Sequence, residues 1–192
     1  MIIGVTGTVG KTTITSHIAH YLRSEYGYES VRISPYHYNG EFGLPLSIID
    51  AKTGGRNPFS WCGVFFSAFV GLFRSYPKYL VLEYGIDHPG EMEYLIHIAR
   101  PDIVIISPIA PNHLEQFGTF ESYRNAKLLL ARASKTRIIH ESLRAYMDME
   151  CLFYGMGGMS DIDASDGIVD IQGTSAQIHF HHQTFSLTLP SF

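Results

Sequence analysis

Residues 4–13, GVTGTVGKTT, are the stretch that decides the fold of this chain. The apolar residues at the start of the chain predict a short buried strand that leads into this stretch. After it, Ile14, Ile18 and Leu22 recur at the spacing of one helix face. A glycine-rich turn between a strand and a helix is the setting that a phosphate-binding loop requires. The sequence therefore predicts a site for a nucleoside triphosphate at the beginning of this helix.

The residue types within the loop suit a polyphosphate. Gly7 and Gly10 permit backbone angles that let successive N–H groups point at one anion. Lys11 adds a positive charge, and the Thr12 hydroxyl can bind Mg²⁺. The strict pattern G-x-x-x-x-G-K-[ST] is broken where Val5 replaces glycine, so a chance Gly-Lys-Thr at a helix start is the alternative. The residues expected to contact the nucleotide are Gly7, Thr8, Val9, Gly10, Lys11, Thr12 and Thr13.

The composition is that of a globular protein. Apolar residues make up 45% of the 192 residues and charged residues 17%, which allows a sizeable core and argues against wholesale disorder. A net charge of −4 argues against a general nucleic-acid-binding protein. The two cysteines, Cys62 and Cys151, are far apart, so neither a disulfide framework nor a structural zinc site is expected. No secretory signal precedes the loop, and we expect a cytoplasmic protein.

Residues 59–73, FSWCGVFFSAFVGLF, are the one membrane-like stretch of the chain. The stretch is shorter than the about 20 residues needed to cross a bilayer, and small residues interrupt it. We therefore expect no stable membrane insertion. A buried or amphipathic helix is the favoured interpretation, and a helix that faces a membrane surface or a partner is the alternative.

A carboxylate stands at the end of a second buried strand. Residues 79–82 predict this strand, and Glu83 follows directly. Ligands of open parallel sheets lie beyond the carboxyl ends of the strands. Glu83 is therefore expected near the phosphate loop, where it could hold a metal ion. A strand-end acid that faces solvent is the alternative.

The remaining pattern predicts a three-layer α/β domain with a mostly parallel sheet, followed by a small antiparallel β section. A helix is expected over 120–133, with Lys127 in its apolar second half, and an ordered loop rather than a helix over 35–50. Toward the C-terminal end, Gly-rich and acidic turns separate short strands. His179 and His181 share one face of such a strand, where exposure is favoured over metal binding. Further strands are expected at 28–34, 103–107, 136–140, 167–172, 175–181 and 184–189.

Four separated parts of the chain resemble one known family in their order and spacing. The chain resembles the central ATP-binding domain of the Mur ligases, which build the peptide of bacterial cell-wall precursors, over about residues 2–190. At two places, the sequence looks most like the branch that adds D-alanyl-D-alanine to UDP-N-acetylmuramoyl-tripeptide. These places are Val9 in the loop and the segment NGEFGLPL (39–46). The missing glycine at Val5 is usual in this family. The four parts are TGTVGKTT (6–13), LEYG with HPGE (82–85 and 88–91), NHLEQFG (112–118) and ESYRNAKLLL (121–130).

The resemblance implies ATP and Mg²⁺ as cofactors and gives roles to particular residues. Lys11 and the loop amides would hold the β- and γ-phosphates. Thr12 and Glu83 would hold one Mg²⁺, and His113 with Lys127 would hold a second. The matching lysine of the family is carbamylated by CO₂, which turns a cation into an anion. A Lys127 side chain that reaches solvent from an apolar helix face is the alternative. Lys11, His113 and Lys127 are the expected catalytic residues.

Two further positions matter for the comparison with the family. Asn39 and Glu41 are expected to contact substrate, with ordinary turn chemistry as the alternative. The strand before the family's histidine usually ends in Thr-Asn-Ile-Gly, whereas this chain has Ser-Pro-Ile-Ala at residues 107–110. Pro108 cannot supply what that asparagine contributes.

The function expected from the resemblance is ATP-dependent amide-bond formation in peptidoglycan precursor synthesis. A UDP-muramoyl-peptide carboxylate would be activated as an acyl phosphate and attacked by D-alanyl-D-alanine, so the partners are small molecules, and no oligomeric state is assigned. We expect a P-loop α/β core over 1–149 and a β appendage over 150–192, without the family's N-terminal UDP-binding and C-terminal amino-acid-binding domains. The alternatives are a Mur-type ligase of the folylpolyglutamate or lipid-amidating type, and a non-catalytic ATP-binding module.

Overall fold

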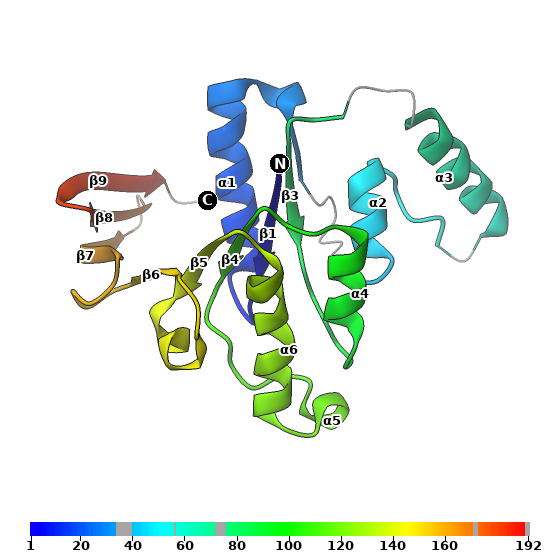
Figure 1. The fold of residues 1–192 in the computed structure, drawn as a ribbon. Coiled ribbons are helices and arrows are strands. Elements are labelled where there is room, and N and C mark those ends of the chain that lie inside the picture. The colour runs from blue at the N-terminus through cyan, green and yellow to red at the C-terminus, as the bar shows by residue number, and fades with distance from the viewer. Residues whose placement is uncertain (34–39, 56, 72–75, 171–172, 191–192) are drawn as a thin grey trace. The chain divides into compact units, whose positions relative to one another are not determined.

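The computed structural model describes residues 1–33, 40–55, 57–71, 76–170 and 173–190 (Figure 1). Two compact units divide the chain, Met1–Thr136 and Arg137–Phe192. The glycine-rich loop, Glu83 and Lys127 all belong to the first unit.

Four parallel strands form the centre of the first unit, in the order β2-β3-β1-β4. β1 pairs with β3 on one side and with β4 on the other, so that Val5 lies opposite Glu83 and Thr6 lies opposite Ile106. Because the strands run in one direction, their carboxyl ends meet at one edge of the sheet. The strands are β1 Ile2–Thr6, β2 Val31–Ile33, β3 Tyr79–Glu83 and β4 Ile103–Ile106.

Helices cover both faces of this sheet, which gives the first unit three layers (Figure 1). α1 lies on one face, against β1, β2 and β3. α6 lies on the other face, against β1 and β4, and α4 packs beside α6. The predicted fold class is confirmed here. The helices are α1 Lys11–Tyr26, the 3-10 helix η1 Tyr28–Ser30, α2 Gly43–Ile49, α3 Pro58–Gly71, α4 Glu91–Ile98, α5 Leu114–Phe117 and α6 Phe120–Ala133.

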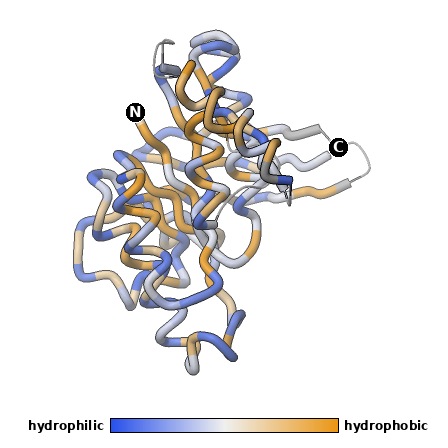
Figure 2. Tube along the Cα trace, turned by 90° about the vertical axis from the view of Figure 1, so that its right-hand side faces the viewer, coloured by the Kyte–Doolittle hydropathy of each residue, from blue (hydrophilic) through white to orange (hydrophobic). Residues whose placement is uncertain are grey.

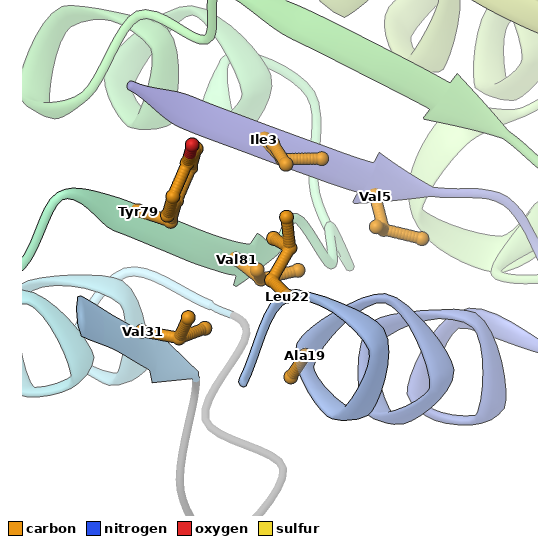
Figure 3. Close-up of a cluster of buried hydrophobic side chains, with 7 residues drawn as sticks. All are labelled: Ile3, Val5, Ala19, Leu22, Val31, Tyr79 and Val81. Carbon is orange, nitrogen blue, oxygen red and sulfur yellow. The ribbon is translucent and has the colours of Figure 1, made fainter. Parts of the chain in front are cut away.

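A cluster of aliphatic and aromatic side chains fills the space between α1 and the sheet, as Figure 3 shows. Side chains alternate along a strand, so every second residue of the three strands points toward α1. This packing fixes the start of α1 close to the end of β1. The cluster consists of Ile3, Val5, Val31, Tyr79 and Val81 from the strands and Ala19 and Leu22 from α1.

Residues 43–49 form the helix α2, although the Pro and Gly pattern predicts a loop over 35–50, so that prediction is wrong for this segment. Pro45 lies in the first turn, where its missing N–H is tolerated. Leu44 and Leu46 are buried, and Asp50 ends the helix in a left-handed conformation with φ of 56°. The burial of the two leucines therefore stabilises this helix by more than the glycine and proline residues of the segment destabilise it.

α3 confirms the helix that residues 59–73 predict, except that residues 72 and 73 lie outside the described part. Trp61 and Val64 pack against side chains of the α2 region, but Phe59 and Phe66 are 84% and 69% exposed. The expected buried or amphipathic helix is therefore found on its packed side only, because the exposed side carries aromatic rather than polar residues. Figure 2 looks from the side on which α3 lies in Figure 1, and hydrophobic colouring runs along much of this helix.

The second unit pairs its strands in two ways. β5, β6 and β7 run parallel, whereas β7, β8 and β9 form an antiparallel meander, which confirms the predicted antiparallel section. The acidic stretch that predicts turns belongs instead to β7, where a bulge between Ser165 and Ile168 accommodates Asp166 at φ of 52°. The elements are β5 Thr136–His140, the 3-10 helix η3 Glu141–Tyr146, β6 Leu152–Gly155, β7 Ile162–Asp170, β8 Gly173–Phe180 and β9 Gln183–Pro190.

The histidines near the C-terminal end do not form a metal site. His181 and His182 make the turn between β8 and β9, so His181 does not share a strand face with His179, contrary to the prediction. The two ring nitrogens of His179 are hydrogen-bonded to Ser165 at 2.9 Å and to Thr184 at 3.1 Å. Among the residues that the structure describes, no three His, Cys, Asp or Glu side chains are arranged to hold a metal ion.

Candidate functional site

The loop between β1 and α1 is shaped by two glycines. Gly7 has φ of 142° and Gly10 has φ of 79°, values that side-chain-bearing residues rarely adopt. A Cβ atom on Gly7 would also collide with the side chain of Ser107, which follows β4. Only glycine therefore fits at position 7, for both conformational and steric reasons.

The loop is held by hydrogen bonds to the segment after β4. The Ser107 hydroxyl donates to the Val9 carbonyl at 2.6 Å, and the Thr8 N–H donates to the Pro108 carbonyl at 3.0 Å. The Thr8 hydroxyl donates to the carbonyl of Ala110 at 3.1 Å and accepts its N–H at 3.0 Å. In the segment that departs from the family pattern, Pro108 thus contributes its carbonyl, which proline retains. Hydrogen bonds within the chain thus hold the loop in the shape that its glycines permit.

The first turn of α1 offers amide groups and a lysine to an anion. Gly10 is the N-cap and no side chain there accepts a hydrogen bond from this 16-residue helix, so its first N–H groups point out of the helix end. The Lys11 ammonium donates to the carbonyls of Gly7 and Thr8, each at 3.3 Å. Thr13 lies in the same turn, exposed to solvent. The concentration of donors and positive charge suits a phosphate group.

Thr12 and Glu83 meet across the carboxyl end of the sheet. The Thr12 hydroxyl donates to the Glu83 carboxylate at 2.9 Å, and Glu83 is only 3% exposed. The pairing of β1 with β3 brings them together, because Glu83 is the last residue of β3 and lies opposite Val5. A hydroxyl and a carboxylate side by side are oxygen ligands that Mg²⁺ prefers.

Lys127 is buried on the sheet-facing side of α6 rather than exposed. Its side chain is 1% exposed, and its ammonium nitrogen lies 4.9 Å from the centre of the Tyr123 ring. Burial, and to a smaller extent the positive charge of Lys11, lower the pKa of Lys127 to about 7, although the carboxylates of Asp87 and Glu83 act in the opposite direction. A lysine that reaches solvent is therefore excluded, and near neutral pH much of this group is the uncharged amine.

His113 lies beside an acid that sequence reasoning missed. Its Nε2 atom is 3.3 Å from the carboxylate of Asp87, and its ring centre is 5.9 Å from that of Tyr123, the ring beneath Lys127. His113 has φ of 52° and is the N-cap of α5, which turns its ring toward this region. Asp87 comes from the segment after β3. The signal that could have found it is an acid four residues beyond Glu83, within a segment that already resembled the family.

The structure does not bring all of the predicted residues together. Lys11, Thr12, Glu83 and Lys127 form one cluster of charges and hydroxyls at the carboxyl end of the sheet. Glu41 is exposed in the turn before α2 and makes none of the contacts described above, and Asn39 lies outside the described residues. The proposed substrate contacts of these two residues therefore stay predictions.

A family model, the Mur ligase middle domain, matches residues 5–190. The chain belongs to this family. The predicted resemblance is thereby confirmed, and the match includes the loop, Glu83, His113 and Lys127 within its span. Among the described residues of this family member, no helix is long and apolar enough to cross a membrane.

Known relatives include ligases that add D-alanyl-D-alanine. The UDP-N-acetylmuramoyl-tripeptide--D-alanyl-D-alanine ligase of Bacillus subtilis (strain 168) is 25% identical over 198 residues, which cover 98% of this chain and 37% of the relative. The crystal structure of MurF ligase from Thermotoga maritima in complex with ADP matches with a TM-score of 0.73 and 27% identity, over 100% of this chain and 41% of that one. A crystal structure of MurF from Acinetobacter baumannii has the same fold, with a TM-score of 0.73 and 22% identity. The match covers 98% of this chain and 38% of that one.

The Asp87→Asn variant tests the charge cluster around Lys127. Because the Asp87 carboxylate favours the ammonium form, we expect its loss to lower the pKa of Lys127 below about 7. NMR titration of chain labelled at the lysine side-chain carbons, in CO₂-free buffer, measures this pKa. Glu93→Gln, which removes an exposed acid from α4, is the matched control and should leave the pKa unchanged. An unchanged titration in Asp87→Asn would show that the two side chains do not interact.

Proposed function

We propose that this chain is the ATP-binding central domain of an ATP-dependent amide-bond ligase of peptidoglycan precursor synthesis. The observation that carries the proposal is the contact of Thr12 with Glu83 beside a glycine-shaped loop, in a chain of the Mur ligase middle-domain family. These features support a nucleoside triphosphate, with its terminal phosphates at the loop.

The chemistry needs positive charge, because a substrate carboxylate must approach a phosphate group that is also negative. Lys11 and the amides at the start of α1 supply it in this chain. The lysine side chain now donates to Gly7 and Thr8 carbonyls at 3.3 Å, and turning away from these long hydrogen bonds lets it reach the β- and γ-phosphates. The segment after β4 supports the loop in this role through its hydrogen bonds to Thr8 and Val9.

The residues at the end of β3 fit Mg²⁺. Thr12 and Glu83 provide two oxygen ligands, and the described residues contain no cage of three carboxylate, imidazole or thiolate groups. These two ligands match the usual coordination of Mg²⁺, which binds through one or two protein oxygens together with phosphates and water. When bound, Mg²⁺ would neutralise charge on the phosphates.

Lys127 is proposed to carry a carbamate. Its pKa of about 7 supplies the neutral amine that attacks CO₂. A nitrogen–carbon bond forms, one C=O electron pair of CO₂ moves onto oxygen, and one proton leaves to solvent, so that the neutral amine becomes an anion. Together with His113, this anion would hold a second Mg²⁺. Carbamylation also removes the repulsion between Lys127 and Lys11 that the present charges imply.

The proposed reaction proceeds in two steps. The carboxylate of a UDP-muramoyl-peptide attacks the γ-phosphorus of ATP, which gives an acyl phosphate and ADP. The amine of D-alanyl-D-alanine then displaces phosphate and forms the amide. The chain spans 37% of the length of its Bacillus subtilis relative, and we propose that sites for the uridine nucleotide and the amine belong to parts that this chain does not match. A cytoplasmic location fits the small soluble substrates.

The Lys11→Ala variant tests the phosphate site. Hydrogen bonds to charged groups contribute about 1.5–3 kcal/mol, so we expect this change to weaken Mg-ATP binding by roughly tenfold to a hundredfold. Isothermal titration calorimetry with Mg-ATP measures the affinity. Lys135→Ala is the control, because this lysine is exposed and pairs with Asp102 at 3.6 Å, at the opposite edge of the sheet. Equal affinities of Lys11→Ala and wild type would remove the loop assignment.

Substrate-dependent turnover tests the ligase assignment. Phosphate release from ATP, measured with the protein at its full natural length, should rise only when UDP-muramoyl-tripeptide and D-alanyl-D-alanine are both present. Stimulation by a folate and glutamate would instead indicate the folylpolyglutamate type. Mg-ATP binding without release under any substrate pair would indicate a non-catalytic module.

The pH dependence of carbamylation tests the role of Lys127. With ¹³C-labelled CO₂ held at constant dissolved concentration, the carbamate signal should grow as pH rises through about 7, since only the neutral amine reacts. Lys127→Met should show no signal. Because Lys11 lowers the pKa of Lys127, the Lys11→Ala variant should shift the onset to higher pH, whereas Lys135→Ala should not. A wild-type chain without any carbamate signal above pH 7 would contradict the assignment.

A further inference from the structure

The second unit contains a cavity beside β7 and β8. Its volume is about 640 Å³, which lies within the range of small-molecule sites. It is called the β7–β8 cavity below, and all of its lining residues belong to the second unit. The lining includes Met156 and Ser160 from the segment before β7, Asp163, Ala164 and Asp166 from β7, and His179 from β8.

Asp163 forms the floor of the β7–β8 cavity. It is 8% exposed, whereas the other described residues of the lining are exposed or half-buried. Its Oδ1 atom is buried and accepts no hydrogen bond from the described part of the chain. A buried carboxylate oxygen without a donor is costly, because its hydrogen bonds to water are lost without replacement. Asp163 therefore calls for a donor from outside the chain.

The polar side chains beside Asp163 are already engaged with one another. His179 lies directly opposite Asp163 in the strand pairing. The Ser165 hydroxyl donates to the Asp166 carboxylate at 3.2 Å and is 2.9 Å from Nε2 of His179, so that Nε2 carries the proton that Ser165 accepts. Nδ1 of the ring then accepts from the Thr184 hydroxyl at 3.1 Å. The imidazole N–H is thus committed to Ser165 and does not serve Asp163.

The β7–β8 cavity is acidic. Asp163 and Asp166 both line it, and none of its described lining residues is a lysine or an arginine. A third carboxylate, Glu141, accepts the hydroxyl of the lining residue Ser160 at 2.6 Å. This hydrogen bond lowers the pKa of Glu141, which keeps the group ionised near neutral pH. The surroundings therefore favour a positively charged ligand.

Arg144 is a cation near these acids, and it also contributes to the lowered pKa of Glu141. Its guanidinium lies 4.0 Å from the centre of the Phe153 ring and donates to the Met159 carbonyl at 3.1 Å. Arg144 does not line the cavity. Within the described ranges, neither Asp163 nor Asp166 forms an ion pair with a lysine or an arginine.

We propose that the β7–β8 cavity binds a small alkylammonium ion, whose N–H groups donate to Asp163 and Asp166. An ammonium group is a charged donor without acceptors, which is what the floor of the cavity lacks. The hydrocarbon part can contact Ala164 and Met156, whose flexible side chain is 68% exposed. A metal ion fits less well, because no three His, Cys, Asp or Glu side chains of the described residues are arranged to hold one.

Titration of the ¹⁵N-labelled full chain with 1,4-diaminobutane, followed by NMR, tests the proposal. We expect shifts of the amide signals from the cavity lining, which should weaken as salt is added. Two related compounds separate charge from hydrogen bonding. 1,4-Butanediol has the same carbon chain without charge, and tetramethylammonium has the charge without N–H groups. Each should bind at least about tenfold more weakly than the diamine.

The Asp163→Asn variant removes the charge of the floor at nearly constant shape. We expect it to weaken diaminobutane binding by about tenfold to a hundredfold. Asp166→Asn should also weaken binding, and it is compatible with the fold because asparagine tolerates the φ of 52° at this position. Asp148→Asn is the matched control: it removes an exposed acid of the same unit outside the lining and should leave the affinity unchanged.

Mg-ATP affinity should be the same in all three variants, so the failure of this proposal is distinguishable from the failure of the proposed function. Wild-type affinity for diaminobutane in Asp163→Asn overturns the proposal, and so does equal binding of butanediol. If Asp163→Asn does not fold, wild-type affinity in Asp166→Asn is decisive against it. An equal loss in Asp148→Asn would reduce the binding to general attraction and overturn the site. Shifts of the lining amides with Mg²⁺ but not with diaminobutane would do the same.

Discussion

The parallel pairing of β1 with β3 and β4 is the constraint on which the rest of the first unit depends. It places the carboxyl ends of three strands at one edge, so that the loop after β1, the acid at the end of β3 and the segment after β4 converge. Each of these pieces is far from the others in sequence. The pairing register decides that Glu83 reaches Thr12, and a slip by one residue would turn its carboxylate to the opposite face.

The electrostatics of the site are set by burial rather than by the number of charges. Lys127 is almost fully enclosed, and Glu83 is nearly so. In this setting the positive charge of Lys11 disfavours the ammonium form of Lys127, while the carboxylates of Asp87 and Glu83 compensate in part. The cluster thus combines one cation, Lys11, a lysine that is largely uncharged near neutral pH, and the two carboxylates. Ligands that bring both signs, such as a metal ion with a polyphosphate, can enter it without leaving a large uncompensated charge.

Predictions from sequence succeeded where local pattern and tertiary burial agree. The run before Glu83 is uninterrupted and apolar, and it forms β3; the helix over 120–133 has a strong apolar side and forms α6 with the same bounds. The position of Lys127 on α6 was visible in the sequence, but its enclosure was not. Its surroundings come from the loop, from Asp87 and from the end of β3, which only the folded chain brings together.

The failures have equally specific causes. α2 was missed because breaker residues dominate its local sequence, although its leucines are buried. β7 was missed in part because acidic and glycine residues are stabilised there by pairing with β8. The exposure of the aromatic side of α3 was not the favoured expectation, because large apolar side chains are ordinarily buried, and a buried or amphipathic helix was therefore predicted. Asp87 was missed because its partner, His113, belongs to another segment of the chain.

The contact between Gly7 and Ser107 has a consequence for how this sequence can change. The space that a Gly7 side chain would need is filled by the Ser107 hydroxymethyl group, which also holds the Val9 carbonyl, 98 residues away in sequence. A larger residue at position 107 would collide with the loop, and one without a hydroxyl would lose the hydrogen bond to the Val9 carbonyl. Position 7 therefore requires glycine whatever residue stands at position 107, whereas position 107 is limited to a small side chain that carries a hydroxyl.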